Sequence, residues 1–140
     1  MQRARTYFLA TALAAAILVI GFWSGVHAQG MLTAKEVYRK PIDSVAGKEI
    51  RITDLTIPPG ATSPAHRHPG DTFVYVISGE LQIGLNENAP ATVKAGEVFH
   101  EPPMSLHKST LNPSKTDTAH AIAIMIIDPD KQSTVAPGTK

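Results

Sequence analysis

Cysteine is absent from all 140 residues of the sequence. No disulfide can stabilise the fold, and no side-chain thiol can act as a nucleophile. An excess of charge of one sign is also lacking, because 13 basic residues stand against 12 acidic residues. A chain without a basic stripe gives no electrostatic argument for nucleic-acid binding, so we expect no nucleic-acid partner. Stability must come from one apolar core, which a metal or a partner subunit could assist.

Helical periodicity is missing after the first 28 residues. Short β-branched and apolar runs alternate there with turn signals rich in Gly, Pro and Asn. This pattern predicts an all-β domain, either a barrel or a sandwich. The expected strands are residues 49–57, 73–77, 81–85, 92–94, 98–100, 106–111 and 119–127.

The N-terminus has the order of a secretory signal. Arg3 and Arg5 precede the uncharged apolar run 7–23, and Val26-His27-Ala28 offers a cleavage site. We therefore expect a signal helix in a leader, residues 1–28, and a periplasmic or secreted domain. An uncleaved anchor is the alternative, because the run approaches the ~18 residues that span a membrane. Cleavage would remove two basic residues and no acid.

The remaining chain divides into three parts. Residues 29–46 form an N-terminal arm that could begin with a short helix or an edge strand and ends near Pro41. Residues 47–128 carry the expected strands. Residues 129–140 are polar and contain two prolines, which predicts a flexible C-terminal tail.

Candidate core residues come from the apolar runs. We expect the core and the pocket lining to include Phe73, Tyr75, Ile77, Leu81, Ile83 and Val98. On the last strand His120 shares a face with Ile122, Ile124 and Ile126. This spacing predicts a buried, hydrogen-bonded histidine.

One residue separates His66 from His68. Side chains two apart on an extended strand point to the same side, so both imidazoles can reach one point. Imidazole is the commonest metal ligand in proteins. Gly60 and the Pro69-Gly70 pair surround the two histidines with turn signals. The pair therefore indicates a metal site that takes its other ligands from elsewhere in the chain.

The residues around this pair match a known motif. Gly60, five residues, His66-x-His68 and then Gly79 reproduce the first motif of the cupins. The second cupin motif follows as Gly96, five residues, Pro102 and then His107, with its usual Asn one place late at position 112.

The chain thus resembles small single-domain cupins from about residue 47 to 128. The resemblance implies a jelly-roll barrel with one divalent metal held by His66, His68 and His107. It also implies that a homodimer could form, because many cupins pair through strands near the N-terminus. Residues 33–42 are then a candidate dimer arm.

Two positions depart from the family pattern. Thr72 stands where the first motif has a glutamate that supplies a fourth ligand, and the neighbouring Asp71 would point to the opposite face. Met104 stands where the second motif has a glycine, which suggests an altered loop or an apolar lid. Met104 is therefore grouped with Phe73 and Tyr75 as a candidate for the pocket lining.

Two further residues could belong to the site. His100 could be an extra ligand or an acid–base group, although a place on the surface or behind the ligands is the more favoured interpretation. Glu101 could pair with Arg67 or Lys108, orient a metal-bound histidine, or be exposed at the surface. Asn112 is expected to order the loop that follows it.

Three imidazoles would leave positions open on the metal for a ligand or substrate. With Fe(II), the favoured metal, the site resembles that of some cupin dioxygenases acting on small organic molecules. With Zn(II), Ni(II) or Mn(II), it could act as a Lewis acid. The missing glutamate argues against an isomerase that needs the carboxylate. A non-catalytic module that binds or senses a small ligand or metal is the alternative.

Overall fold

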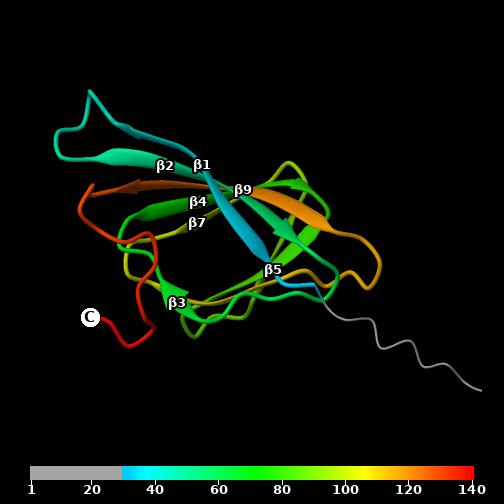
Figure 1. Cartoon of the computed structure of the whole chain (residues 1–140). Coiled ribbons are helices and arrows are strands. Elements are labelled where there is room, and N and C mark those ends of the chain that lie inside the picture. Colours follow the sequence, from blue (N-terminus) through cyan, green and yellow to red (C-terminus); the bar gives the residue numbers. More distant parts are fainter. Residues whose placement is uncertain (1–29) are drawn as a thin grey trace, which may run out of the picture.

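The protein is described by a computed structural model over residues 30–140, and the predicted leader lies outside these residues. This part of the chain is all-β, as predicted (Figure 1). None of its segments is a helix long and apolar enough to cross a membrane. Its strands are β1 (Thr33–Pro41), β2 (Glu49–Ile57), β3 (His66–Arg67), β4 (Asp71–Ser78), β5 (Glu80–Leu85), β6 (Ala91–Lys94), β7 (Val98–Glu101), β8 (Leu106–Leu111) and β9 (Ala119–Ile127).

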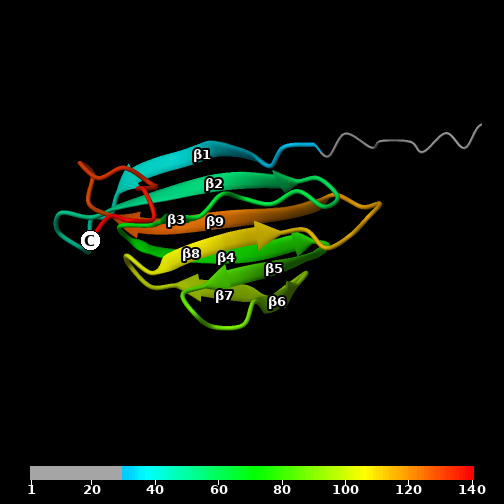
Figure 2. The same cartoon turned by 90° about the horizontal axis from the view of Figure 1, so that it is seen from below.

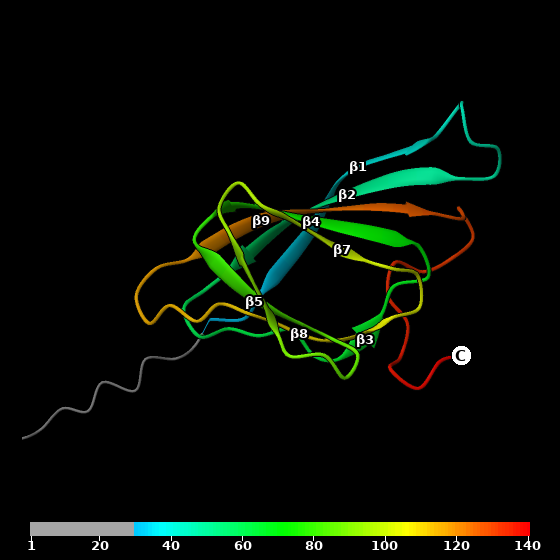
Figure 3. The same cartoon turned by 180° about the vertical axis from the view of Figure 1, so that it is seen from behind.

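The strands form two antiparallel sheets. One has the order β1-β2-β9-β4-β7 and the other the order β3-β8-β5-β6. Figures 2 and 3 show the smaller sheet lying against one face of the larger one, as in a jelly-roll barrel. The predicted strands all form, and their bounds differ from the expected ones by at most two residues.

The N-terminal arm is an edge strand, so the helix alternative is wrong. β1 pairs with β2 along its length, with an irregularity between Glu36 and Tyr38. Every residue of β1 is exposed. A short helix there would have left the edge of β2 unpaired. The two-residue strand β3, which pairs with β8, was not predicted from the sequence.

The core lies between the two sheets. Ile57, Val74 and Val76 of the larger sheet pack with Leu81 and Ile83 of the smaller one, and all five are buried. The predictions for Leu81 and Ile83 are therefore confirmed. Gly79 ends β4 at a φ of 80°, and a side chain there would approach Ala119 Cβ to 2.9 Å. A glycine is needed at this turn for both reasons.

The prediction that Phe73, Tyr75, Ile77 and Val98 belong to the core is wrong. Tyr75 is 40% exposed and Val98 is 59% exposed, because they lie on the outer face of the larger sheet. Their neighbours Thr72, Val74 and Val76 face inward instead. Alternation separates the two sets of side chains but does not say which set is buried.

The last strand shows the same inversion. His120 is exposed, so the prediction of a buried histidine is wrong. The partly exposed Ile122, Ile124 and Ile126 alternate with the inward-facing residues Ala119, Ala121, Ala123, Met125 and Ile127. Small residues thus occupy much of the inner face of β9.

The C-terminal segment is held against the barrel, so the predicted flexible tail is not what residues 129–137 form. Val135 and Arg67 exchange two backbone hydrogen bonds of 2.9 and 3.0 Å. Arg67 Nε also donates to the Pro137 carbonyl at 2.7 Å. Arg51, which is buried, donates to the Pro129 carbonyl and to Ser133 Oγ. These partners are distant in sequence, which is why composition did not reveal them.

The loop after β8 is ordered by Asn112, as predicted. Its amide nitrogen donates to the carbonyls of Ile57 and Asp117, both at 2.8 Å. Its amide oxygen accepts a 3.0 Å bond from the backbone N–H of Ser114.

Candidate metal centre

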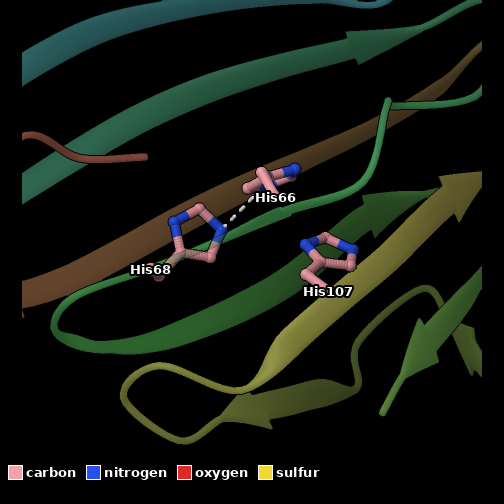
Figure 4. A group of neighbouring side chains, drawn as sticks. All are labelled: His66, His68 and His107. Carbon is pink, nitrogen blue, oxygen red and sulfur yellow. Dashed lines mark hydrogen bonds between the residues drawn. The ribbon is translucent and has the colours of Figure 1, made fainter. Parts of the chain in front are cut away.

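Three histidines meet at one end of the barrel. His66 on β3 lies directly opposite His107 on β8 in the strand register, and His68 follows two residues after His66. The ring centroid of His66 is 4.6 Å from that of His68 and 4.7 Å from that of His107. Figure 4 shows the three rings turned toward a common space. The fold therefore brings together the three residues that the sequence identified as metal ligands.

The nitrogen atoms of His66 and His68 are arranged for a cation. Nδ1 of His66 donates to the Pro64 carbonyl at 2.8 Å, and Nδ1 of His68 donates to the Ser133 carbonyl at 2.8 Å. In neutral rings these bonds place the lone pairs on Nε2. The two Nε2 atoms nevertheless approach each other to 3.0 Å. Because two lone pairs repel at that distance, a shared metal ion would resolve the contact.

Burial prepares these rings to bind metal. It lowers the pKa of both His66 and His68, and the backbone hydrogen bonds oppose this effect only in part. Neutral imidazole is the form that coordinates a metal. The two histidines are therefore in the required state at neutral pH.

His107 and Glu101 complete the buried end of the site. His107 Nε2 contacts Thr110 Oγ1 at 2.9 Å, whereas Nδ1 lies 3.1 Å from Glu101 Oε2. The same carboxylate oxygen is 3.6 Å from His68 Nε2. Glu101 is 1% exposed, and within residues 30–140 neither of its side-chain oxygens has a hydrogen-bond partner.

The contacts of Arg67, Lys108 and Glu101 decide between the interpretations that the sequence allowed for Glu101. Arg67 donates to the carbonyls of Met104 and Pro137, and Lys108 pairs with Glu87. Pairing of Glu101 with Arg67 or Lys108 is therefore wrong, and so is exposure at the surface. Its carboxyl group is directed at the histidines.

Asp71 and His100 lie outside the site. His100 Nε2 donates to Asp71 Oδ1 at 2.9 Å, and both side chains are more than 40% exposed. The His100 ring stacks on Phe73, with centroids 4.6 Å apart. The surface position favoured for His100 is confirmed, and the alternative of a role for Asp71 or His100 beside the metal is wrong, because strand alternation directs both to the outer face. Thr72 is buried, and its hydroxyl donates to the Gly70 carbonyl at 3.4 Å.

The predicted pocket lining also needs correction. Phe73 and Tyr75 point away from the cavity because they belong to the outer face of β4. Met104 does not line the cavity either; its φ is 60°, and its N–H donates to the His68 carbonyl at 2.7 Å. Met104 thus keeps a backbone conformation that favours glycine and supports His68 through the backbone.

A cavity of about 350 Å³ opens beside the histidines. Its apolar walls include Leu32, Leu55, Val74, Ala123 and Met125, and its hydroxyl groups include those of Thr53, Thr72, Thr110 and Ser133. The volume is at the lower end of the range of about 300–1,000 Å³ for small-molecule pockets. A larger hollow of about 960 Å³ near loop 111–116 has no histidine or carboxylate in its lining. The smaller cavity is therefore the better candidate for chemistry.

Sequence reasoning missed two residues that position the ligands. The Ser133 carbonyl holds His68 from the C-terminal segment, and Thr110 contacts His107 three residues along the same strand. Regular alternation would place residues three apart on opposite faces, and the irregularity in the pairing of β5 with β8 brings Thr110 to the same side as His107. Ser133 lies 65 residues from His68, and only the tertiary structure reveals their contact.

The comparisons with known proteins agree with this fold. A family model described as a cupin domain matches residues 53–125, just over half of the chain. No curated protein matches. Similar solved structures include an uncharacterized conserved protein with a double-stranded β-helix domain from Klebsiella pneumoniae. It is 18% identical, with 80% of this chain and 84% of that chain covered and a TM-score of 0.62.

Two further structures share the fold at lower scores. A Cupin 2 conserved barrel domain protein from Salinispora arenicola is 23% identical, with 70% of this chain and 76% of that chain covered and a TM-score of 0.54. The DMSP lyase DddQ from Ruegeria pomeroyi is 17% identical, with 65% and 45% covered and a TM-score of 0.53. At these identities the likeness shows the fold alone.

Proposed function

Because this chain belongs to the cupin family, we propose that it is an exported mononuclear metal protein whose metal acts on a small organic molecule. The observation that carries the proposal is the 3.0 Å approach of two Nε2 atoms whose rings are already oriented through Nδ1. His66, His68 and His107 would hold the ion. A divalent metal there would supply a redox or Lewis-acid centre with positions open to a ligand.

The cavity supports metal-centred chemistry. Among its described lining residues, the titratable side chains are the three histidines and Glu101, and all four belong to the metal end. Within residues 30–140, the cavity lining offers no other acid or base for proton transfer away from the metal end. The apolar walls would exclude water from a bound molecule. We therefore favour a dioxygenase-like oxidoreductase with Fe(II).

The DMSP lyase among the similar structures does not change this preference. Its identity to this chain is only 17%, so its activity is not transferred. Zn(II), Ni(II) and Mn(II) remain the other candidate metals, since imidazole suits several of them. A Lewis-acid reaction on a carbonyl would be the corresponding activity.

Metal content tests the site directly. We expect about one equivalent of metal in the purified protein and loss of most of it in His66→Ala and His107→Ala. His120→Ala is the matched control, because this histidine is exposed on the outer face. Full metal content in the His66→Ala/His107→Ala double variant would refute the site.

Oxygen consumption tests the reaction class. The Fe(II)-loaded protein is expected to take up O₂ with a member of a panel of diketones, phenols and thiols, and His66→Ala is expected not to. A protein that keeps its metal but never consumes O₂ would contradict the oxygenase. It would favour the second candidate, a non-catalytic module that binds or senses a small ligand, which the same enclosed, largely apolar cavity also suits.

Export remains a prediction, since residues 1–28 lie outside the described residues. Mass spectrometry of the mature protein from the cell envelope or medium should find a chain that begins at Gln29. A chain that retains residues 1–28 and sediments with membranes would instead support the anchor.

A further inference from the structure

Glu101 occupies a position that is costly without a cation. It lies at the end of β7, where His100 points outward and Glu101 points into the barrel. Both carboxyl oxygens are buried, and neither has a hydrogen-bond partner within the described residues. No lysine or arginine lines the cavity in this part of the chain. Burial of an unpaired carboxylate is unfavourable, and a bound cation would compensate its charge.

The strand register explains why this carboxyl group is at the site. Glu101 is paired with Thr72 across β4 and β7. Position 72 is the place where the cupin pattern has its glutamate, and Thr72 also faces inward. Two residues directly opposite each other on antiparallel strands present their side chains to the same region. A carboxylate can therefore reach the histidines from either strand.

We propose that Glu101 is a fourth metal ligand, supplied by β7 in place of the missing glutamate at position 72. Its Oε2 atom is already 3.1 Å from His107 Nδ1 and 3.6 Å from His68 Nε2. The site then combines three neutral imidazoles with one carboxylate, and the buried negative charge is neutralised by the ion. This assignment rests on the proposed metal site and adds its anionic ligand.

The ligand set has a consequence for metal preference. Carboxylate oxygen suits Mn(II) better than imidazole alone does, whereas Zn(II) binds well to imidazole. We therefore expect Glu101→Gln to weaken Mn(II) binding more than Zn(II) binding. If Glu101 only supported the fold, its replacement would weaken the binding of both metals equally.

Titration of the metal-free protein with Mn²⁺ or Zn²⁺ against a chromophoric chelator tests the assignment. Glu101→Gln is expected to lower Mn²⁺ affinity by more than about 100-fold, which is the upper limit for loss of a group that merely supports a ligand. The metal-free variant should melt at the same or a higher temperature than the metal-free wild type, because an unpaired buried carboxyl group is removed.

The exchange variant Thr72→Glu/Glu101→Thr provides a second test. It should recover most of the Mn²⁺ affinity lost in Glu101→Gln, since it returns the carboxylate from the opposite strand. Unchanged Mn²⁺ affinity in Glu101→Gln, together with loss of binding in His66→Ala, would overturn the role of Glu101 and leave the histidine site intact. Normal binding in His66→Ala would instead reject the proposed metal site itself.

Discussion

The two faces of the larger sheet do not follow the simple expectation that the larger apolar side chains point into the core. Around the cavity the inner face carries modest side chains such as Thr72, Val74 and Ala123. The outer face carries the bulkier Phe73, Tyr75 and Ile124 on the same strands. Larger side chains inside would fill the space beside the histidines. The barrel keeps its cavity because the bulkier side chains of these strands point outward.

The comparison also separates two kinds of charge. The inward-facing Glu101 is buried, and its carboxyl oxygens have no hydrogen-bond partner among residues 30–140, whereas Asp71, 30 residues earlier, is exposed and contacts His100. Water solvates the outer pair, so little depends on it. Water does not solvate the buried carboxyl group of Glu101 in this way, which makes Glu101 the more informative residue about function.

The largest contrast is expected between two isoleucines on opposite faces. Ile57→Ala should lower the free energy of unfolding by about 2–5 kcal/mol, because Ile57 is fully buried in the core. Ile77→Ala should cost less than about 1 kcal/mol in the monomer, since Ile77 is half exposed. Urea denaturation at a dilution where the protein is monomeric measures both. Equal losses would break the distinction between the faces.

The next effect concerns the C-terminal segment, which holds the open end of the inner face. Deletion of residues 131–140 removes the Ser133 carbonyl that orients His68. Metal affinity should fall by about 10–100-fold, or roughly 1.4–2.7 kcal/mol. Deletion of residues 138–140 keeps Ser133 and serves as control. An unchanged affinity in the longer deletion would show that the segment does not position the ligand.

The inner histidines should also make the metal-free protein sensitive to acid. Burial lowers the folded-state pKa of His66 and His68 below 6.5, so the unfolded chain binds more protons just below that pH. Their contribution to stability is present above pH 6.5 and is lost as the pH falls through the lowered values. The melting temperature should therefore drop between about pH 7 and pH 5.

A variant that lacks the two inner imidazoles provides the control for this pH effect. His66→Ala/His68→Ala should show a weaker dependence of melting temperature on pH over the same range. A metal-free wild type that melts at the same temperature throughout would contradict the assignment.

The smallest effect is expected on the outer face. Asp71→Asn removes the exposed carboxylate that contacts His100, which should cost less than about 1 kcal/mol, and any charge contribution should become smaller still at high salt. Chemical denaturation at low and high ionic strength measures it. A loss above that size would show that the outer pair is more enclosed than its exposure of more than 40% implies.

Much of the strand pattern could be predicted, because turn signals and β-branched runs are local. The face that is buried could not. On β4 and β9 the larger apolar side chains face outward, so hydrophobicity selected the wrong set. Alternation alone allows either set of side chains on a strand to be the buried one, and only packing against the second sheet decides between them.

The sequence by itself placed His66 and His68 on one strand face through their spacing, and its resemblance to the cupins implied His107. It also showed that position 72 lacks the expected carboxylate. Only the tertiary structure brought Glu101 opposite Thr72, and Ser133 against His68. These contacts join residues far apart in the chain, and strand pairing and the path of the C-terminal segment decide them. Spacing along a single strand carries no record of either.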